Sequence, residues 1–224
     1  TFEGRPRIHV NQSQLQTLHQ QLAEVVPVSV ANYVILVRQH GVGRGSGESV
    51  DAASVAIDWS TQASFELSSL MQLVQTSVAI RGKGKRVVVS SPIDIATGSV
   101  GTPIDQLFDQ LSLTDETRLV GRVDVLSAPA EVIAAVPGLD LTRAQQIVTA
   151  RSGAGQETRH PIGILATSGI DMSVVQEVLR YFTIGGDVLR AELTGSLGEG
   201  TPEFRCEVVV DASHGRGSWT LLNL

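Results

Sequence analysis

The stretch RVDVLSAPAEVIAAVPGLDLTRAQQIVTAR, residues 122–151, decides the predicted fold. It opens with an extended segment, Val123–Val125, and Ser127 then predicts the start of a helix as its N-cap. Pro137-Gly138 ends this helix, because proline cannot continue it and glycine tolerates a positive φ. A second helix restarts near Thr142 and carries three apolar residues on one side: Ala144, Ile147 and Val148. This spacing indicates a helix-hairpin-helix unit.

A weaker copy of the same pattern covers residues 5–41. Ile8-His9-Val10 takes the place of Val123–Val125, and a leucine stripe predicts the first helix: Leu15, Leu18 and Leu22. After Pro27, the second helix repeats the spacing of Ala144, Ile147 and Arg151 with Ala31, Val34 and Arg38. The turn lacks the Pro-Gly pair, so we interpret the first hairpin as degenerate.

These patterns divide the chain into four segments. They are a first, degenerate helix-hairpin-helix unit (1–47), a connector with a short helix and a β-hairpin (48–101), a second helix-hairpin-helix unit (102–160), and two helices with a three-stranded antiparallel sheet (161–224). In the connector, apolar spacing predicts the short helix over Ser64–Leu73. Alternating segments near the C-terminus predict the strands: 187–194, 203–210 and 218–224. The predicted class is α+β, with two SAM-like helix-hairpin-helix units in a mostly helical N-terminal part and the sheet last.

Composition narrows the class of protein. A hydrophobic fraction of 42% with 18% charged residues is typical of an ordered globular chain. The formal charge of −6 argues against a dedicated nucleic-acid binder, which usually carries a basic surface. Cys206 is the one cysteine, so no intramolecular disulfide can form. No apolar run approaches the roughly 18 residues that a membrane-spanning helix needs.

Motifs for catalysis or cofactor binding are missing from the sequence. The histidines form neither an HExxH pair nor a Cys/His cluster: His9, His19, His40, His160 and His214. The Gly41–Gly47 loop follows a predicted helix, so we interpret it as a linker and not as a phosphate-binding loop. The pair Asp105/Asp109 is interpreted as a solvated helix face. We therefore predict a protein that is not an enzyme, and identify no cofactor.

The second hairpin is the candidate site, made of Pro137, Gly138, Leu139, Asp140 and Arg143. In nucleic-acid-binding hairpins the turn presents backbone N–H groups to a phosphate, and nearby cations add salt-sensitive affinity. Here three arginines balance three acidic residues: Arg122, Arg143 and Arg151 against Asp124, Glu131 and Asp140. Asp140 also places a carboxylate where phosphate would approach. These features favour a structural turn and argue against nucleic acid as a partner.

The same residues resemble a known family, the type II secretion system protein K, which is a large minor pseudopilin. Its corresponding stretch typically reads Gly-Arg-Ile-Asn-Val-Asn-Thr-Ala-Pro-x-Glu-Val-Leu before a Pro-Gly turn. The matching residues are Gly121, Arg122, Val125, Ala128, Pro129, Glu131, Val132, Pro137 and Gly138. Asp124, Leu126 and Ser127 depart from that pattern. The resemblance covers about residues 118–224, is weaker over 5–40, and is almost absent between them.

The resemblance implies a non-catalytic structural component that caps the tip of a pseudopilus by binding other minor pseudopilins. It also implies an anchor in the bacterial inner membrane, through an N-terminal helix absent from this chain, with the remainder in the periplasm. An apolar helix of roughly 20 residues, preceded by a prepilin-type cleavage site, is then expected upstream of Thr1. Some members bind calcium, so calcium is an expectation from resemblance alone.

The alternative is a helix-hairpin-helix nucleic-acid-binding protein of the DNA-uptake or repair type. DNA-uptake proteins share the hairpin but not the C-terminal strands, which favours the secretion family.

Overall fold

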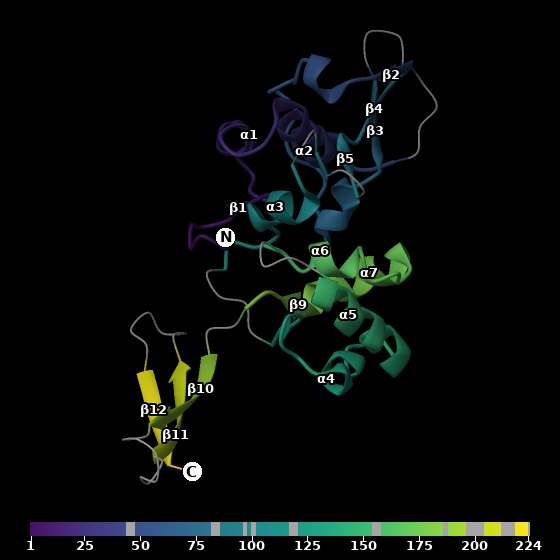
Figure 1. Ribbon diagram of the computed structural model, residues 1–224. Helices are drawn as coiled ribbons and strands as arrows, with labels where there is room; N and C mark the ends of the chain where they lie inside the picture. The colour runs from purple at the N-terminus through teal and green to yellow at the C-terminus, as the bar shows by residue number, and fades with distance from the viewer. Residues whose placement is uncertain are drawn as a thin grey trace. The chain divides into compact units, whose positions relative to one another are not determined.

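In the computed structural model (Figure 1), two pairs of very short parallel strands each bring together the start and the end of a run of helices. β1 (Ile8–His9) pairs with β7 (Leu111–Ser112), and β8 (Val123–Asp124) pairs with β9 (Phe182–Thr183). The chain forms a larger unit, residues 1–184, and a smaller unit, residues 185–224. The structure describes residues 1–43, 48–81, 86–95, 98–99, 102–116, 121–153, 158–185, 188–195, 204–211 and 218–223.

The first helical module comprises residues 7–40 and 103–112 of the larger unit. After β1, α1 (Leu15–Ala23) and α2 (Val28–His40) form a helical hairpin, and α3 (Ile104–Asp109) leads into β7. The predicted leucine stripe of α1 is buried: Leu15, Leu18 and Leu22. Pro27 directly precedes α2, where its fixed φ suits a helix start.

The second helical module comprises residues 122–183 and follows the same order from strand to helices to strand. Between β8 and β9 it contains α4 (Ala130–Ala134), α5 (Leu141–Gly153), α6 (Ile162–Leu165), α7 (Met172–Val178) and the 3-10 turn η3 (Leu179–Tyr181). The residue before α4 is Pro129, so the predicted N-cap role of Ser127 is wrong. Ser127 Oγ instead donates a hydrogen bond to Asp124, 2.6 Å away.

An insertion, residues 41–102, separates α2 from α3 in the first module. Its elements are β2 (Glu48–Val50), η1 (Ala52–Ser54), η2 (Leu70–Leu73), β3 (Ser77–Arg81), β4 (Arg86–Ser90), β5 (Ile93–Asp94) and β6 (Gly98–Ser99). β4 is the central strand of a three-stranded sheet, antiparallel to β3 and parallel to β2. β5 and β6 form a separate antiparallel pair. Residues 44–47 of the predicted linker lie outside the described residues.

The helix predicted over Ser64–Leu73 is reduced to the 3-10 turn η2. The backbone groups of the preceding residues bind elsewhere: the N–H groups of Ser64 and Phe65 donate to the carbonyl of Arg38. The Asn11 side chain accepts from the N–H of Leu67 and donates to its carbonyl, at 2.9 Å each. Because these groups are occupied, they are not available for helical hydrogen bonds.

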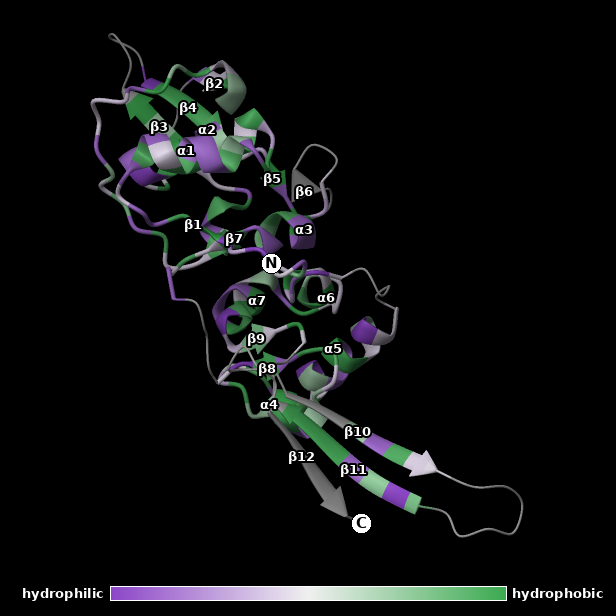
Figure 2. Ribbon diagram, turned by 90° about the vertical axis from the view of Figure 1, so that its left-hand side faces the viewer, coloured by the Kyte–Doolittle hydropathy of each residue, from purple (hydrophilic) through white to green (hydrophobic). Residues whose placement is uncertain are grey.

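The insertion also explains why the two modules differ in sequence. In α2, the residues from Ser29 to Gln39 are all buried, and η1 and β3 pack against this helix. Figure 2 shows β3 and β4 as mainly hydrophobic strands beside it. In α5, which has no such cover, the buried residues are Ala144 and Ile147. Because α2 is buried on nearly all sides, it does not show the amphipathic pattern that α5 has.

Asp109 at the end of α3 is buried, so its interpretation as part of a solvated helix face is wrong. Its side chain is 1% exposed and lies 2.8 Å from the Arg7 guanidinium. Both carboxylate oxygens accept from the N–H of Phe2, at 2.9 and 2.8 Å. Arg7 Nε also donates to the Asp109 carbonyl. A pattern in one helix does not reveal a partner about a hundred residues away.

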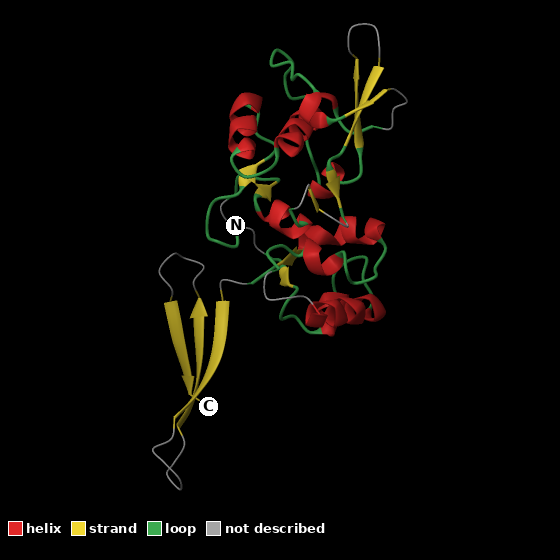
Figure 3. Ribbon diagram, turned by 45° about the horizontal axis from the view of Figure 1, so that its top comes forward, coloured by secondary structure: helices red, strands yellow, loops and turns green. Residues whose placement is uncertain are grey.

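The smaller unit consists of three described strands (Figure 3). They are β10 (Val188–Gly195), β11 (Phe204–Asp211) and β12 (Ser218–Asn223). β11 pairs antiparallel with both neighbours, with Leu193 opposite Cys206 and Val210 opposite Trp219. The described chain thus combines helices with several small sheets, and the predicted α+β class is confirmed.

Candidate functional site

The predicted hairpin lies between α4 and α5. The N–H of Leu139 donates to the carbonyl of Val136, 3.0 Å away, which tightens the turn after Pro137. Gly138 has φ +92°, a conformation that side-chain-bearing residues rarely adopt. Pro137 and Gly138 are exposed, whereas Leu139 is half-buried and packs against the core. The positive φ at this position therefore explains why a glycine follows Pro137.

The carboxylate of Asp140 lies at the start of α5, where a phosphate would bind in a nucleic-acid-binding hairpin. Oδ1 accepts a hydrogen bond of 2.8 Å from the N–H of Arg143, as an N-cap does at the start of a helix. Arg143 donates to the carbonyl of Gly138 at 3.0 Å and lies 3.9 Å from Asp140 Oδ2. A phosphate at this helix start would meet the negative charge of Asp140 first. Both charged groups of the turn thus stabilise the turn itself.

Gly138→Ala is expected to lower the free energy of unfolding by about 1–2 kcal/mol, since a Cβ disfavours positive φ. Space is not the cause, because the new Cβ would lie 3.6 Å from Val178 Cγ1, an ordinary contact. Gly153→Ala is the matched control, because that glycine ends α5 without a positive φ or a close neighbour. Chemical denaturation of both variants measures the difference. Equal stabilities would contradict a required positive φ at Gly138.

One arginine in each module holds the second helix of the hairpin to the segment after the first strand. Arg38 Nη2 donates to the carbonyls of Asn11 and Gln12, at 2.9 and 3.2 Å. Arg151 Nη1 donates to the carbonyls of Val125 and Ala128, at 3.3 and 2.6 Å. The arginine that ends the repeated spacing in α2 and α5 therefore makes the same kind of contact in both modules, with backbone carbonyls after the first strand.

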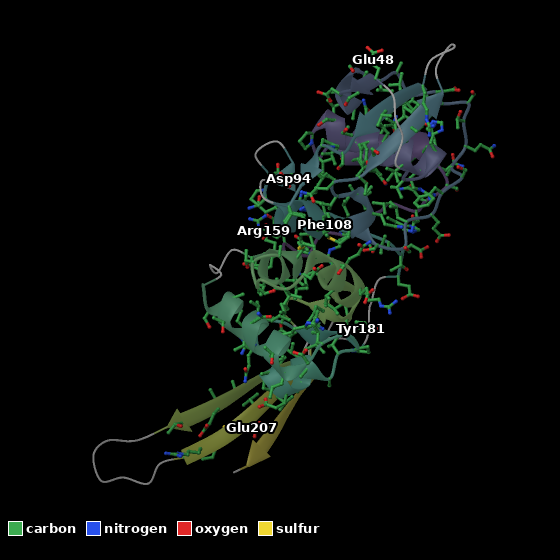
Figure 4. All side chains as sticks on the ribbon, turned by 90° about the vertical axis from the view of Figure 1, so that its right-hand side faces the viewer. Glu48, Asp94, Phe108, Arg159, Tyr181 and Glu207 are labelled. Carbon is green, nitrogen blue, oxygen red and sulfur yellow. The ribbon has the colours of Figure 1, made fainter. Side chains whose placement is uncertain are left out.

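A cavity of about 680 Å³ lies in the larger unit, where parts of both modules meet. Its wall includes Arg7, Arg122, His160, Arg180 and Tyr181, and it reaches the Pro137-Gly138 turn. Figure 4 labels Tyr181, and also Phe108 and Arg159, which belong to α3 and to the segment before α6. The N–H of Arg159 donates to Asp105 on α3, 3.1 Å away, so this segment is tied to the first module.

His160 is a neutral imidazole in this cavity wall. The N–H of Ile162 donates to His160 Nδ1 at 3.3 Å, which places the ring proton on Nε2. Phe108 packs edge-on against the ring, with centroids 5.5 Å apart. Burial, followed by the charges of Arg7 and Arg122, lowers the pKa of His160 from 6.5 to about 3. The residue keeps some contact with solvent through the cavity, which reduces the energetic effect of this shift.

His160 should make the fold less stable in acid. A lowered folded-state pKa means that the unfolded chain binds more protons between pH 6.5 and about 3, so stability falls as the pH drops through that window. Between pH 7 and 5 we expect His160 to account for a loss of about 1–2 kcal/mol. Denaturation of the wild type and of His160→Gln at both pH values measures this. His40, whose pKa burial also lowers, is present in both proteins and cancels. The same pH dependence in both would contradict a neutral His160.

The cavity brings together residues that sequence reasoning did not connect: Arg7, Arg122, His160 and Arg180. Arg7 and Arg122 precede the corresponding strands of the two modules, and this repetition is the one sequence signal that could have paired them. Of the predicted hairpin residues, Pro137 and Gly138 reach the cavity wall.

Within the described residues, no group of three or more His, Cys, Asp or Glu side chains could hold a metal ion. The calcium expectation therefore has no ligand set in that part of the chain. Among the same residues, no helix has the length and apolar character needed to cross a membrane. Comparison of the chain with protein-family models, curated proteins and solved structures yielded no match.

Proposed function

We propose that this chain is a non-catalytic scaffold, the periplasmic portion of a protein-K-like minor pseudopilin in a type II secretion system. It would act by contacts with other minor pseudopilins at the pseudopilus tip, anchored in the inner membrane by a helix outside this chain. In this proposal the two modules are helix-hairpin-helix units of the SAM-like kind, and the three C-terminal strands form the pilin sheet. The observation that carries the proposal is the repeated module whose hairpin polar groups bind within the module.

The hairpin contacts favour a scaffold over a nucleic-acid binder. Asp140 caps α5, Arg143 binds the turn carbonyl, and Arg151 binds the backbone after β8. A phosphate-binding hairpin leaves its N–H groups and cations free for the ligand. Here the same groups stabilise the hairpin, as a packing role requires.

The smaller unit supports the proposal through the pattern of its sheet. Strand register places Ala191, Leu193, Phe204, Cys206 and Val208 on one face. The opposite face carries mostly polar residues: Glu192, Thr194, Arg205 and Glu207. A single sheet with one apolar face needs cover, because buried apolar area is what stabilises it. Leu193 and Phe204 are exposed, at 53% and 59%. The resemblance supplies a cover for this face, a pilin helix that precedes the chain.

Reconstitution tests the proposal. The chain is mixed with the periplasmic portions of the other minor pseudopilins from the same secretion system, and complexes are separated by size-exclusion chromatography. We expect the chain to elute with at least one of them. Elution of the chain alone from every mixture, together with a mobility shift of duplex DNA at low salt, would replace the scaffold with the nucleic-acid alternative.

A matched pair of variants tests the sheet in cells. In the complete gene, Leu193→Arg places a charge on the apolar face, and Thr194→Arg places the same charge on the other. We expect Leu193→Arg to abolish secretion and Thr194→Arg to retain it. Normal secretion with both variants would exclude a covered apolar face.

A further inference from the structure

Two arginines at corresponding positions of the two modules line the same cavity. Arg7 directly precedes β1, and Arg122 directly precedes β8. Both side chains contribute to the wall of the 680 Å³ cavity. The modules therefore present two guanidinium groups to one shared cavity, which is partly open to solvent.

The two arginines differ in their partners. Arg7 binds Asp109, which stands two residues before Leu111, the strand partner of Ile8. In the second module, Phe182 is the strand partner of Val123, so the residue two positions earlier is Arg180. An arginine thus replaces the aspartate. Among the residues that the structure describes, Arg122 has neither a hydrogen bond nor an ion pair, although it is half-buried.

No described polar residue on the wall forms a hydrogen bond or an ion pair with Arg122. The hydroxyls of Ser112 and Ser173 donate within the chain, to the carbonyl of Thr114 and to Asp171. His160 offers the N–H of Nε2, since Nδ1 accepts from the backbone. Burial and the neighbouring Arg7 lower the pKa of Arg122, a sign that its charge lacks compensation in the protein.

The charges define the missing partner. Arg7, Arg122 and Arg180 contribute three positive charges; Glu177 on the wall and Asp109 behind Arg7 contribute two negative ones. One positive charge remains, which a monoanion neutralises. Inorganic phosphate, a mixture of monoanion and dianion at neutral pH, carries on average more than one negative charge and would exceed it. Leucines on the same wall offer an apolar surface next to this charge: Leu70, Leu111, Leu113 and Leu179.

We propose that the cavity binds a ligand that carries a carboxylate next to an apolar group. The ligand carboxylate would pair with the Arg122 guanidinium, as the Asp109 carboxylate pairs with the Arg7 guanidinium. Guanidinium and carboxylate groups match in two parallel hydrogen bonds. The volume lies within the usual range for small-ligand sites. A small carboxylic acid and an acidic side chain in a peptide share this chemistry. Such binding does not depend on the pseudopilin role.

Calorimetric titration of the full chain tests the proposal with two pairs of probes. N-acetyl-leucine is compared with N-acetyl-leucinamide, and the blocked peptide Leu-Glu-Leu with Leu-Gln-Leu. We expect the acid of at least one pair to bind at least about tenfold more tightly than its neutral partner, as a charge-assisted hydrogen bond would. The pair that responds identifies a small acid or a peptide side chain as the source. Equal binding within both pairs, or tighter binding of inorganic phosphate, would overturn the proposal.

Arg122→Met identifies the site. Because Arg122 has no partner in the described part of the chain, the variant should keep or raise the melting temperature while the preferred acid binds at least about tenfold more weakly. Arg5→Met is the control, since Arg5 is exposed, pairs with Glu3 and does not line the cavity. In the wild type, nuclear magnetic resonance titration should show a higher His160 pKa in the presence of the acid. Unchanged affinity in Arg122→Met, or a clear loss of its stability, would refute the assignment.

Discussion

Replacing Asp109 by asparagine is expected to lower the free energy of unfolding by about 3 kcal/mol, because it removes one partner of a buried ion pair. The side chain is 1% exposed and binds both the Arg7 guanidinium and the N–H of Phe2. Asparagine has nearly the same shape but no charge, and its amide presents hydrogen atoms to one of these donors. Arg7 then loses its carboxylate.

Thermal unfolding measures this loss, which should lower the melting temperature by about 8 °C for a unit of this size. Glu3→Gln is the control, since Glu3 pairs with Arg5 and Arg159 at an exposure of 49%. Exposed pairs contribute less than about 1 kcal/mol. A change in Asp109→Asn as small as that of the control would show that the ion pair does not hold β1 to β7.

Arg38→Met is expected to lower the free energy of unfolding by about 3 kcal/mol, because it leaves three part-buried carbonyls without their donor. Arg38 is 4% exposed and donates to the carbonyls of Asn11, Gln12 and Phe65. These contacts tie α2 to the end of β1 and to the insertion. Methionine keeps most of the apolar stem, so the loss reports the hydrogen bonds and not a cavity.

Arg151→Met is the matched variant in the second module. Arg151 binds two carbonyls and is half-buried, so water can replace part of its contacts, and we expect a loss of about 1 kcal/mol. Urea denaturation of both variants compares them directly. A larger loss in Arg151→Met than in Arg38→Met would contradict the stronger role that burial gives Arg38.

Features that depend on neighbouring residues were predictable from the sequence. Pro137-Gly138 requires a turn, and the leucine stripe of α1 indicates a buried helix face, so the structure places a hairpin at each position. The class α+β follows from the change of period between the helices and the C-terminal strands. These signals need no knowledge of the tertiary structure.

Features that depend on distant residues were not predictable. Asp109 reads as a surface residue until Arg7 and Phe2 are placed against it. Residues 64–67 keep apolar helical spacing, but Arg38 and Asn11 bind their backbone groups. The strands β7 and β9 are two residues long and carry no alternation. The cavity brings together two arginines that lie 115 positions apart in the sequence, Arg7 and Arg122. The charge count over residues 122–151 balanced Arg122 against acidic residues of the same segment, with which it forms no ion pair in the described structure.

The insertion between α2 and α3 also has a consequence during synthesis. Ile8 pairs with Leu111, so the first module cannot close until more than a hundred further residues have left the ribosome. At about 5–20 residues per second this takes roughly 5–20 s. Until β3 has been made, about 40 residues after the end of α2, this helix lacks part of the cover that buries Ser29 to Gln39 in the native fold. The second module closes within one continuous stretch. Until β3 and β7 have been made, the nascent N-terminal half exposes apolar surface that a chaperone would cover.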